Sequence, residues 1–177
     1  MKLNALAFAA VTGLAMGHAQ ADNIVLNGTL AVTDPTFNRA FVIGSLSAVG
    51  TAVFYDGFSF IGVTPGAYTF TMVTGPTKTF DSFLALYAGG FSAAAPLTNL
   101  VALNDDLNGS LTSSGFTYTL NATTVYTVVS TSYANGTTGD YTTTIASVPV
   151  PEPESYALFV VGLAGLATWM RRQSRSA

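Results

Sequence analysis

Side chains that can act as nucleophiles, bases or metal ligands are scarce in this chain of 177 residues. It contains no cysteine and one histidine, His18, so cysteine–histidine catalysis is excluded and a serine–histidine–aspartate triad has one imidazole at most. Zinc sites built from imidazole and thiolate ligands are excluded for the same reason. Glycoside hydrolysis needs two carboxylates in different environments, and nothing in the spacing of the aspartates indicates such a pair. The sequence therefore predicts a protein that is not an enzyme.

Calcium is the one metal that suits the remaining oxygen-bearing side chains, because it binds aspartate, asparagine and backbone carbonyl oxygens. The candidate ligands are Asp81, Asn104, Asp105 and Asp106, with Asn108 close behind. Their spacing is not that of an EF-hand loop, which carries alternating acidic residues, a glycine and a bidentate glutamate. An acidic turn, in which these side chains bind neighbouring backbone amides, explains the same residues. Both interpretations stay open, and no other cofactor is expected.

The overall composition excludes two further classes of protein. Hydrophobic residues make up 49% of the chain and charged residues only 8%, against about 25% charged in an average soluble domain. A disordered chain needs low hydrophobicity and high net charge, and a nucleic-acid-binding protein needs a basic surface. Residues 22–149 contain two basic residues, Arg39 and Lys78, and seven aspartates. This negative balance disfavours binding to anionic polymers.

Four Asn-x-Ser/Thr triplets are potential sugar-attachment sites, beginning at Asn27, Asn108, Asn121 and Asn135. Several such triplets arise by chance in a chain rich in Asn and Thr, and the pattern has meaning only where a glycosyltransferase acts on the protein. Glycosylation is a hypothesis that unmodified asparagine peptides in a mass spectrum would remove.

The first 21 residues have the pattern of a secretory signal peptide. Lys2 supplies the positive charge, residues 5–16 form a short apolar core, and Ala19 and Ala21 form the small-x-small end that signal peptidase cleaves. A buried core helix has an apolar run of similar length, but it explains neither the lysine nor the Ala-x-Ala end. We expect cleavage after Ala21 and export through the inner membrane, which also removes His18.

Residues 150–177 consist of three consecutive parts. Pro151-Glu152-Pro153 favours an extended backbone, an uncharged apolar stretch follows at 156–170, and the tail 171–177 contains Arg171, Arg172 and Arg175. The fifteen residues of the apolar stretch span roughly 22 Å as a helix, less than the ~30 Å hydrocarbon core, so they form a marginal transmembrane helix. Trp169 suits the membrane interface, and the positive-inside rule places the arginines in the cytoplasm and the main domain outside.

This three-part end resembles the PEP-CTERM sorting signal, which combines a Pro-Glu-Pro motif, a short membrane helix and a basic tail. The resemblance covers residues 150–175 and implies recognition by an exosortase, a membrane transpeptidase of Gram-negative bacteria that produce exopolysaccharide. The exosortase would cut near residues 151–153 and discard the helix, so the protein would be anchored transiently and then reach the cell surface or the extracellular space. A plain C-terminal anchor and a buried core helix are the alternatives, although a core helix needs neither Pro-Glu-Pro nor an arginine cluster.

Residues 22–149 are expected to form one all-β domain. Short β-branched and aromatic runs alternate with Gly, Pro and Asn turn signals, and no stretch has the apolar spacing of an amphipathic helix. Eight or nine strands at this spacing predict a single β-sandwich of the jelly-roll type. The candidate strands are 24–32, 40–49, 54–63, 68–73, 82–87, 97–103, 116–120, 125–132 and 141–148.

Two of these regions carry more specific expectations. The clearest hairpin joins residues 116–120 to residues 123–129, with threonines outward and an inward set formed by Phe116, Tyr118, Leu120 and Val125. The threonine-rich strand 141–145 is either an ordinary packed strand or an edge available for association.

The segment Phe54-Tyr55-Asp56-Gly57-Phe58 resembles the Phe-x-Asp-x-Phe motif of one PEP-CTERM family. That family has no assigned biochemical activity to carry over to this chain. From the residues themselves, Phe54 and Phe58 are expected to anchor the start of a strand in the core, with Asp56 in a turn or cap between them.

A weaker resemblance extends over residues 80–145. The segments that carry it are 80–87, 104–106 and 139–141, which are similar to the pre-peptidase C-terminal β-sandwich domains of secreted bacterial proteins. Those domains are accessory and binding modules, so this resemblance supports the expected fold more than any function.

Three functions remain open at this point. The first is a non-enzymatic protein of the cell surface or extracellular matrix, associated with exopolysaccharide in a biofilm or floc. The second is a carbohydrate-binding module, which needs a row of exposed aromatic side chains on one sheet; the candidates are Tyr55, Tyr87, Phe91 and Tyr133. The third is a periplasmic domain that its C-terminal helix keeps anchored in the membrane.

Overall fold

The structure, a computed structural model, describes residues 23–62, 64–148, 159–166 and 170–171. Strands dominate the described part of the chain, and the prediction of an all-β fold is confirmed. The strands are β1 (Ile24–Leu30), β2 (Thr36–Phe37), β3 (Ala40–Val42), β4 (Ser45–Leu46), β5 (Val53–Ile61), β6 (Gly66–Thr74), β7 (Ser82–Ala88), β8 (Leu100–Asn104), β9 (Ser113–Leu120), β10 (Val125–Ser132) and β11 (Gly139–Ser147).

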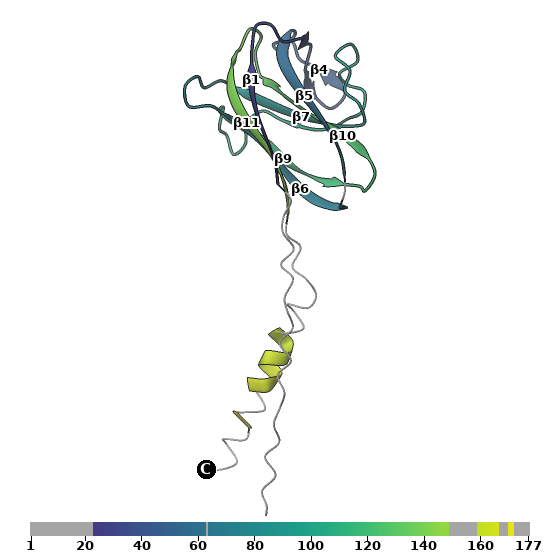
Figure 1. The fold of residues 1–177 in the computed structure, drawn as a ribbon, viewed down its shortest axis with the longest axis vertical. Coiled ribbons are helices and arrows are strands. Elements are labelled where there is room, and N and C mark those ends of the chain that lie inside the picture. The colour runs from purple at the N-terminus through teal and green to yellow at the C-terminus, as the bar shows by residue number, and fades with distance from the viewer. Residues whose placement is uncertain (1–22, 63, 149–158, 167–169, 172–177) are drawn as a thin grey trace, which may run out of the picture.

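Two large antiparallel sheets face each other as a sandwich (Figure 1). Their strand orders are β1-β11-β6-β9 and β2-β5-β10-β7-β8, and β3 and β4 form a separate small sheet. The eight long strands pair from the ends of the sequence inward: β1 with β11, β5 with β10, β6 with β9, and β7 with β8. This nested pairing over two sheets is the arrangement of a jelly roll.

The core between the sheets follows from the alternation of side chains along each strand. In β11 the buried residues Tyr141, Thr143 and Ile145 alternate with more exposed neighbours. The residues that build this core come from both sheets and include Leu30, Phe70, Met72, Leu84, Leu86, Leu120, Tyr126, Val128 and Ile145. Strand β11 lies between β1 and β6, so of the two alternatives for residues 141–145 the ordinary packed strand is the one that the structure shows.

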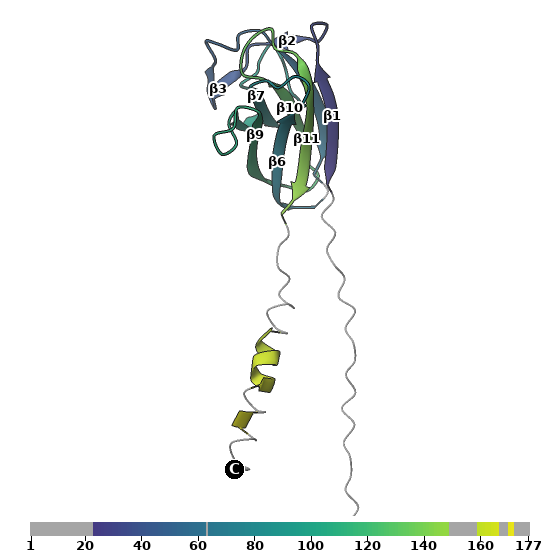
Figure 2. The same ribbon diagram turned by 90° about the vertical axis from the view of Figure 1, so that its left-hand side faces the viewer.

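A second hydrophobic cluster covers the outer face of the five-stranded sheet. It contains Phe37, Ala40, Val53, Phe83, Ala85, Tyr87, Leu100 and Val129. Strand β7 is therefore buried on both faces, which explains why its sequence is an almost unbroken apolar run. Figure 2 shows β2 and β3 at one end of the sandwich, whereas β11 finishes at the other end.

The expected strand 40–49 is wrong, because the chain reverses direction within it. Strand β3 ends at Val42, and β4 begins at Ser45 after a turn in which Gly44 has a φ of 89°. A left-handed backbone conformation is readily adopted by glycine, which lacks a Cβ atom. The hydrophobic residues of this small hairpin do not pack as one buried strand, and many are exposed: Phe41, Val42, Ile43, Leu46 and Val49.

The expected hairpin between residues 116–120 and 123–129 is also wrong. Strands β9 and β10 follow each other in sequence, but β9 pairs with β6 at the edge of one sheet and β10 lies inside the other. The inward direction of Phe116, Tyr118 and Leu120 is correct, since Thr117 and Thr119 between them are exposed. Val125, expected to face this set, is 43% exposed. The turn crosses from one sheet to the other instead of closing a hairpin.

Both predicted targeting segments lie largely outside the described residues. The signal peptide of residues 1–21, with its cleavage residues Ala19 and Ala21, is outside them entirely, as is the boundary at residues 149 and 150. Of the expected membrane helix 156–170, residues 159–166 and 170 are described, and they are helical. Among the described residues, no helix is long and apolar enough to cross a membrane.

Candidate functional site

The C-terminal sorting residues can be placed only in part. Pro151, Glu152, Pro153 and Arg172 lie outside the described residues, whereas Arg171 is described and exposed in a helical position. The described helical residues 159–166 are exposed throughout, including the large apolar side chains Phe159 and Leu163. An uncharged helix with apolar side chains on all sides matches an apolar environment better than water.

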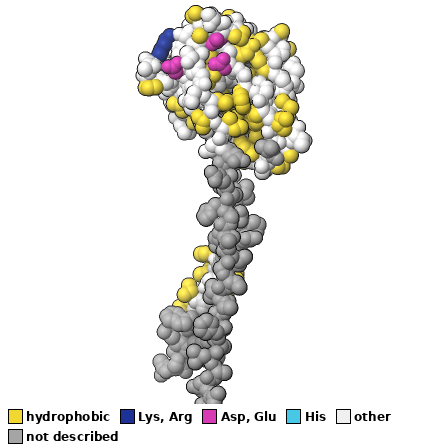
Figure 3. Space-filling view, in the orientation of Figure 1, with side chains coloured by type: hydrophobic (Ala, Val, Ile, Leu, Met, Phe, Trp, Pro, Cys, Tyr) yellow, Lys and Arg dark blue, Asp and Glu magenta, His cyan; other side chains and the backbone are white. Residues whose placement is uncertain are grey.

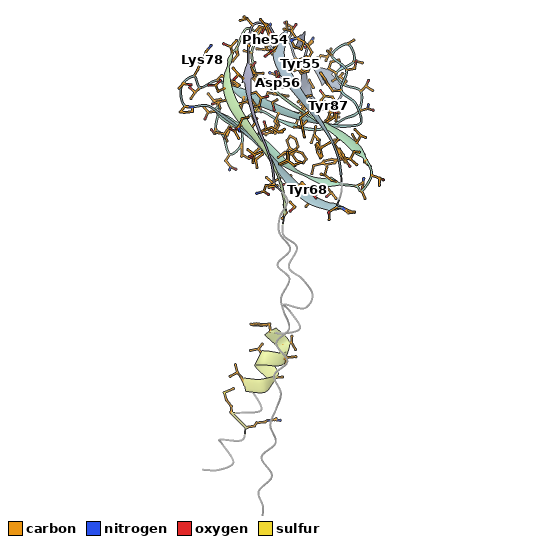
Figure 4. All side chains as sticks on the ribbon, viewed as in Figure 1. Phe54, Tyr55, Asp56, Tyr68, Lys78 and Tyr87 are labelled. Atoms are coloured by element: carbon orange, nitrogen blue, oxygen red, sulfur yellow. The ribbon has the colours of Figure 1, made fainter. Side chains whose placement is uncertain are left out.

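The Phe-x-Asp-x-Phe segment lies in the first half of strand β5, not at a turn (Figure 4). The expected turn or cap at Asp56 is therefore wrong, because Asp56 is a mid-strand residue paired with Ser130 of β10. Phe54 packs against the core between the sheets as expected. Phe58 does not, since it is 37% exposed.

Asp56 instead receives a hydrogen bond from the opposite sheet. The Tyr141 hydroxyl in β11 donates to the Asp56 carboxylate over 2.6 Å. Burial raises the pKa of the Tyr141 hydroxyl, and the hydrogen bond to Asp56 raises that pKa further, so the hydroxyl stays protonated and remains a donor. The contact ties β5 to β11 across the sandwich.

This contact depends on a glycine in the neighbouring strand. A Cβ atom at Gly28 of β1 would lie 2.3 Å from the Tyr141 hydroxyl oxygen, closer than any non-bonded contact permits. The absent side chain leaves the space through which Tyr141 reaches Asp56. Beside it, the Ser130 and Thr143 hydroxyls bond to each other over 2.8 Å, and together these side chains form a polar group inside the sandwich.

The predicted calcium ligands occupy a different region, where the chain enters β7 and leaves β8. The Asn104 side-chain oxygen accepts a hydrogen bond from the Gly115 amide over 3.0 Å, and the Asp105 carboxylate accepts one from the Asp106 amide over 3.1 Å. The Asp105 bond is the local kind that the acidic-turn interpretation expects, whereas the Asn104 bond ties the end of β8 to β9. In the described part of the chain, no group of three or more acidic or histidine side chains is placed to hold a metal ion, and calcium binding stays a prediction.

Arg39 is the positive charge of this region, and sequence reasoning missed its importance. Its side chain is 1% exposed and its guanidinium carbon lies 4.4 Å from the ring centre of Phe83 and 4.3 Å from that of Tyr133. Burial lowers the pKa of the guanidinium, and the charges of Asp105 and Asp81 act in the opposite direction. Burial raises the pKa of the Asp81 carboxyl, and the charges of Asp106 and Asp105 raise it further. Arg39 thus supplies counter-charge to these carboxylates.

The four aromatic residues expected to form a carbohydrate platform are packed into the domain. Tyr55 and Phe91 stand edge-on to Phe37 at centroid distances of 5.1 and 5.0 Å. Tyr87 is 1% exposed and donates its hydroxyl hydrogen to the Pro96 carbonyl, while Tyr133 lies against Arg39. They do not form an exposed row on either sheet.

The outer surface of the four-stranded sheet is rich in threonine. Most of its outward positions carry uncharged side chains, and Asp140 of β11, which accepts a hydrogen bond from the Thr29 hydroxyl, is an acidic exception. The uncharged polar positions on β1, β6, β9 and β11 include Asn27, Thr29, Thr69, Thr71, Thr117, Thr119, Thr142 and Thr144. The threonine-rich surface can donate and accept hydrogen bonds, but it offers little charge. In the view of Figure 3, which has the orientation of Figure 1, basic and acidic side chains also take up little area, and hydrophobic side chains take up more.

Comparison with known protein families concerns the C-terminal end. A family model for the PEP-CTERM protein-sorting motif matches residues 149–172. The chain carries a PEP-CTERM sorting motif. This motif is the recognition signal of exosortase processing, and it implies export to the cell envelope or surface. No curated protein matches the chain.

Proposed function

We propose that the protein is a non-enzymatic component of the cell surface or extracellular matrix, sorted by an exosortase and associated with exopolysaccharide in a biofilm or floc. The PEP-CTERM motif at residues 149–172 is the observation that carries this proposal. In the full route, signal peptidase cleaves after Ala21, the helix 156–170 holds the chain in the inner membrane with its arginines in the cytoplasm, and exosortase cuts near residues 151–153.

The chemistry of the β domain supports the non-enzymatic part of this proposal. Once the signal peptide is removed, no histidine or cysteine is left in the chain. The threonine-rich surface of the four-stranded sheet offers hydroxyl groups for hydrogen bonds to a hydrated polysaccharide. The excess of aspartate over basic residues keeps the domain soluble and away from anionic polymers, so a neutral polysaccharide is the better match.

The test is the intact mass of the protein isolated from its host and from the same host lacking its exosortase. We expect the host protein to begin at Asp22 and to end near residues 151–153, with any additional mass at the new C-terminus. The deletion host should retain the helix and the arginines. A tail that extends to Ala177 in both hosts would contradict the proposal and favour a permanently anchored periplasmic domain.

Two variants sharpen this experiment. Replacing Pro151, Glu152 and Pro153 together by alanine should block processing in the normal host, because the motif itself is altered. Glu154→Ala removes a neighbouring carboxylate outside the triplet and serves as the matched control, with processing expected to continue. Fractionation of the culture should then show the processed protein at the surface or in the matrix and the triplet variant in the membrane.

A further inference from the structure

A groove opens on the side of the sandwich where β1 and β5 lie opposite each other. It has a volume of about 390 Å³, within the ~300–1,000 Å³ of small-molecule sites. Its lining includes Leu26, Gly28, Asp56, Phe58, Ser130 and Tyr141. The groove exists because β1 is an edge strand and because β2 pairs with β5 only at Val53 and Phe54, leaving the described remainder of β5 without a strand on that side.

The floor of the groove is a fixed hydrogen-bond acceptor. The Asp56 carboxylate has about four acceptor positions, and the hydrogen bond from the Tyr141 hydroxyl uses one of them. Because Tyr141 stays protonated, it holds the carboxylate in place without neutralising its negative charge. The remaining acceptor positions suit hydroxyl groups of a ligand. Ser130 also lines the groove, but it is buried and its hydroxyl is already bonded to that of Thr143.

The rim of the groove is a rigid aromatic surface. The Phe58 ring is 37% exposed and stacks on the Phe60 ring with a centroid distance of 6.2 Å and an interplanar angle of 15°. Phe60 packs in turn against the core between the sheets. Phe58 is therefore an exposed aromatic ring whose orientation is supported from below, two residues from the carboxylate on the same side of β5.

An aromatic ring beside a carboxylate suits a sugar, which has both an apolar face and a hydroxyl-bearing edge. The C–H face of a pyranose packs on an aromatic ring, while its hydroxyl edge donates hydrogen bonds to carboxylate oxygens. An anionic ligand would be repelled by Asp56. In the described β domain, residues 23–62 and 64–148, the two basic side chains are Arg39, which is buried, and Lys78, which is not among the groove residues.

We propose that the groove between β1 and β5 binds one unit of a neutral saccharide, with Phe58 against the ring and Asp56 accepting hydrogen bonds from its hydroxyl groups. This inference rests on the proposed function, because the proposed association with exopolysaccharide identifies the polymer from which the saccharide unit would come. This proposal gives the Phe-x-Asp-x-Phe segment a role in binding. The proposed site is one groove at the edge of a sheet, and not a row of exposed aromatic side chains across the face of a sheet.

The test uses the full chain in a detergent whose head group contains no sugar. The probes are the methyl glycosides of glucose, galactose, mannose and N-acetylglucosamine, with glucuronate as the anionic comparison, measured by saturation-transfer NMR and titration calorimetry. At least one neutral glycoside should bind saturably and more tightly than glucuronate. Absence of binding by all four glycosides, or tighter binding of glucuronate, would overturn the proposal.

Two variants locate the binding. Phe58→Ala should weaken binding by about tenfold, since one aromatic contact is lost, and Asp56→Asn should also weaken it while leaving an acceptor for Tyr141. Phe41→Ala is the matched control, because Phe41 is a 57% exposed phenylalanine in the β3–β4 hairpin, and it should bind like the unaltered chain. Binding that survives Phe58→Ala but not Phe41→Ala would assign the site elsewhere. Because exosortase-dependent processing is measured separately in the host, failure of the groove and failure of the proposed function are distinguishable.

Discussion

At the scale of single residues, Arg39 is the side chain with the most demanding environment. Its Nε donates to the Tyr133 carbonyl and one terminal nitrogen to the Ala40 carbonyl, both over 2.9 Å, while the group lies between two aromatic rings. A lysine has a single compact ammonium that cannot reproduce the planar, two-pronged contact. We expect Arg39→Lys to lower the free energy of unfolding by about 2 kcal/mol, measured by urea denaturation.

Lys78→Met is the control for this prediction, because Lys78 is exposed and bonds to the Thr138 hydroxyl. Its free energy of unfolding should stay within about 0.5 kcal/mol of the unaltered chain. If Arg39→Lys also stays within about 0.5 kcal/mol of the unaltered chain, the positive charge, which lysine retains, explains the role of Arg39, and the planar contact between the rings does not.

Gly28 offers a second test, since it controls whether Tyr141 reaches Asp56. Gly28→Ala places a Cβ atom where the Tyr141 hydroxyl lies and should destabilise the fold by about 1–3 kcal/mol through overpacking. Gly57→Ala is the matched substitution on the facing strand, where the nearest atom to a new Cβ is a Thr127 methyl carbon at 3.9 Å. It should change the free energy of unfolding by less than about 0.5 kcal/mol. A tolerated Gly28→Ala would show that Tyr141 has another position available.

At the scale of elements, sequence patterns predict strand positions better than strand partners. Residues 125–132 coincide with β10 as expected, and the inward side of β9 is correct. The predicted pairing of β9 with β10 is wrong. Two consecutive strands show the same alternation of hydrophobic and polar residues whether they form a hairpin or lie in different sheets, and only their long-range strand partners distinguish the two cases. The contacts of Asp56 and Arg39 cannot be predicted from local sequence for a related reason: their partners, Tyr141 and Tyr133, lie 85 and 94 positions away in sequence.

The segment that leads into β7 and the loop that follows β8 give a pH-dependent prediction. The pKa of the Asp81 carboxyl is raised by burial and by the charges of Asp106 and Asp105, and it is lowered less by Arg39. A carboxyl with a raised pKa in the folded state opposes folding once it is ionised, so its cost is present at neutral pH and vanishes below the unfolded value of about 3.9. Asp81→Asn should therefore raise the free energy of unfolding at pH 7, with little effect at pH 3.

The same measurement decides the calcium prediction. If Asp81→Asn lowers stability at pH 7, and calcium raises the melting temperature of the unaltered chain above its value in chelator, then a cation holds Asp81, Asp105 and Asp106. If calcium has no effect, the acidic turn with Arg39 as its counter-charge accounts for these residues.

At the scale of the whole molecule, the last strand of the sandwich ends before the sorting motif begins. Its last strand residue is Ser147, and the Val148 amide makes the final backbone bond, to the Ala67 carbonyl over 2.8 Å. Ile24 at the start of β1 pairs with Ile145 near the end of β11, so both ends of the domain leave from the same side. Exosortase cleavage near residues 151–153 would therefore release a domain with all of its strands.

The position of this last strand predicts where the chain can be shortened without unfolding the domain. A chain that ends at Val148 should have the same free energy of unfolding as the full chain, because every strand and the bond to Ala67 remain. A chain that ends at Thr144 loses Ile145, which is 1% exposed in the core, and should be destabilised by about 2–5 kcal/mol. Urea denaturation of both chains, with the full chain in the same detergent as reference, measures the difference. A destabilised chain ending at Val148 would mean that residues beyond the sandwich stabilise it, and that exosortase processing alters the domain as well as releasing it.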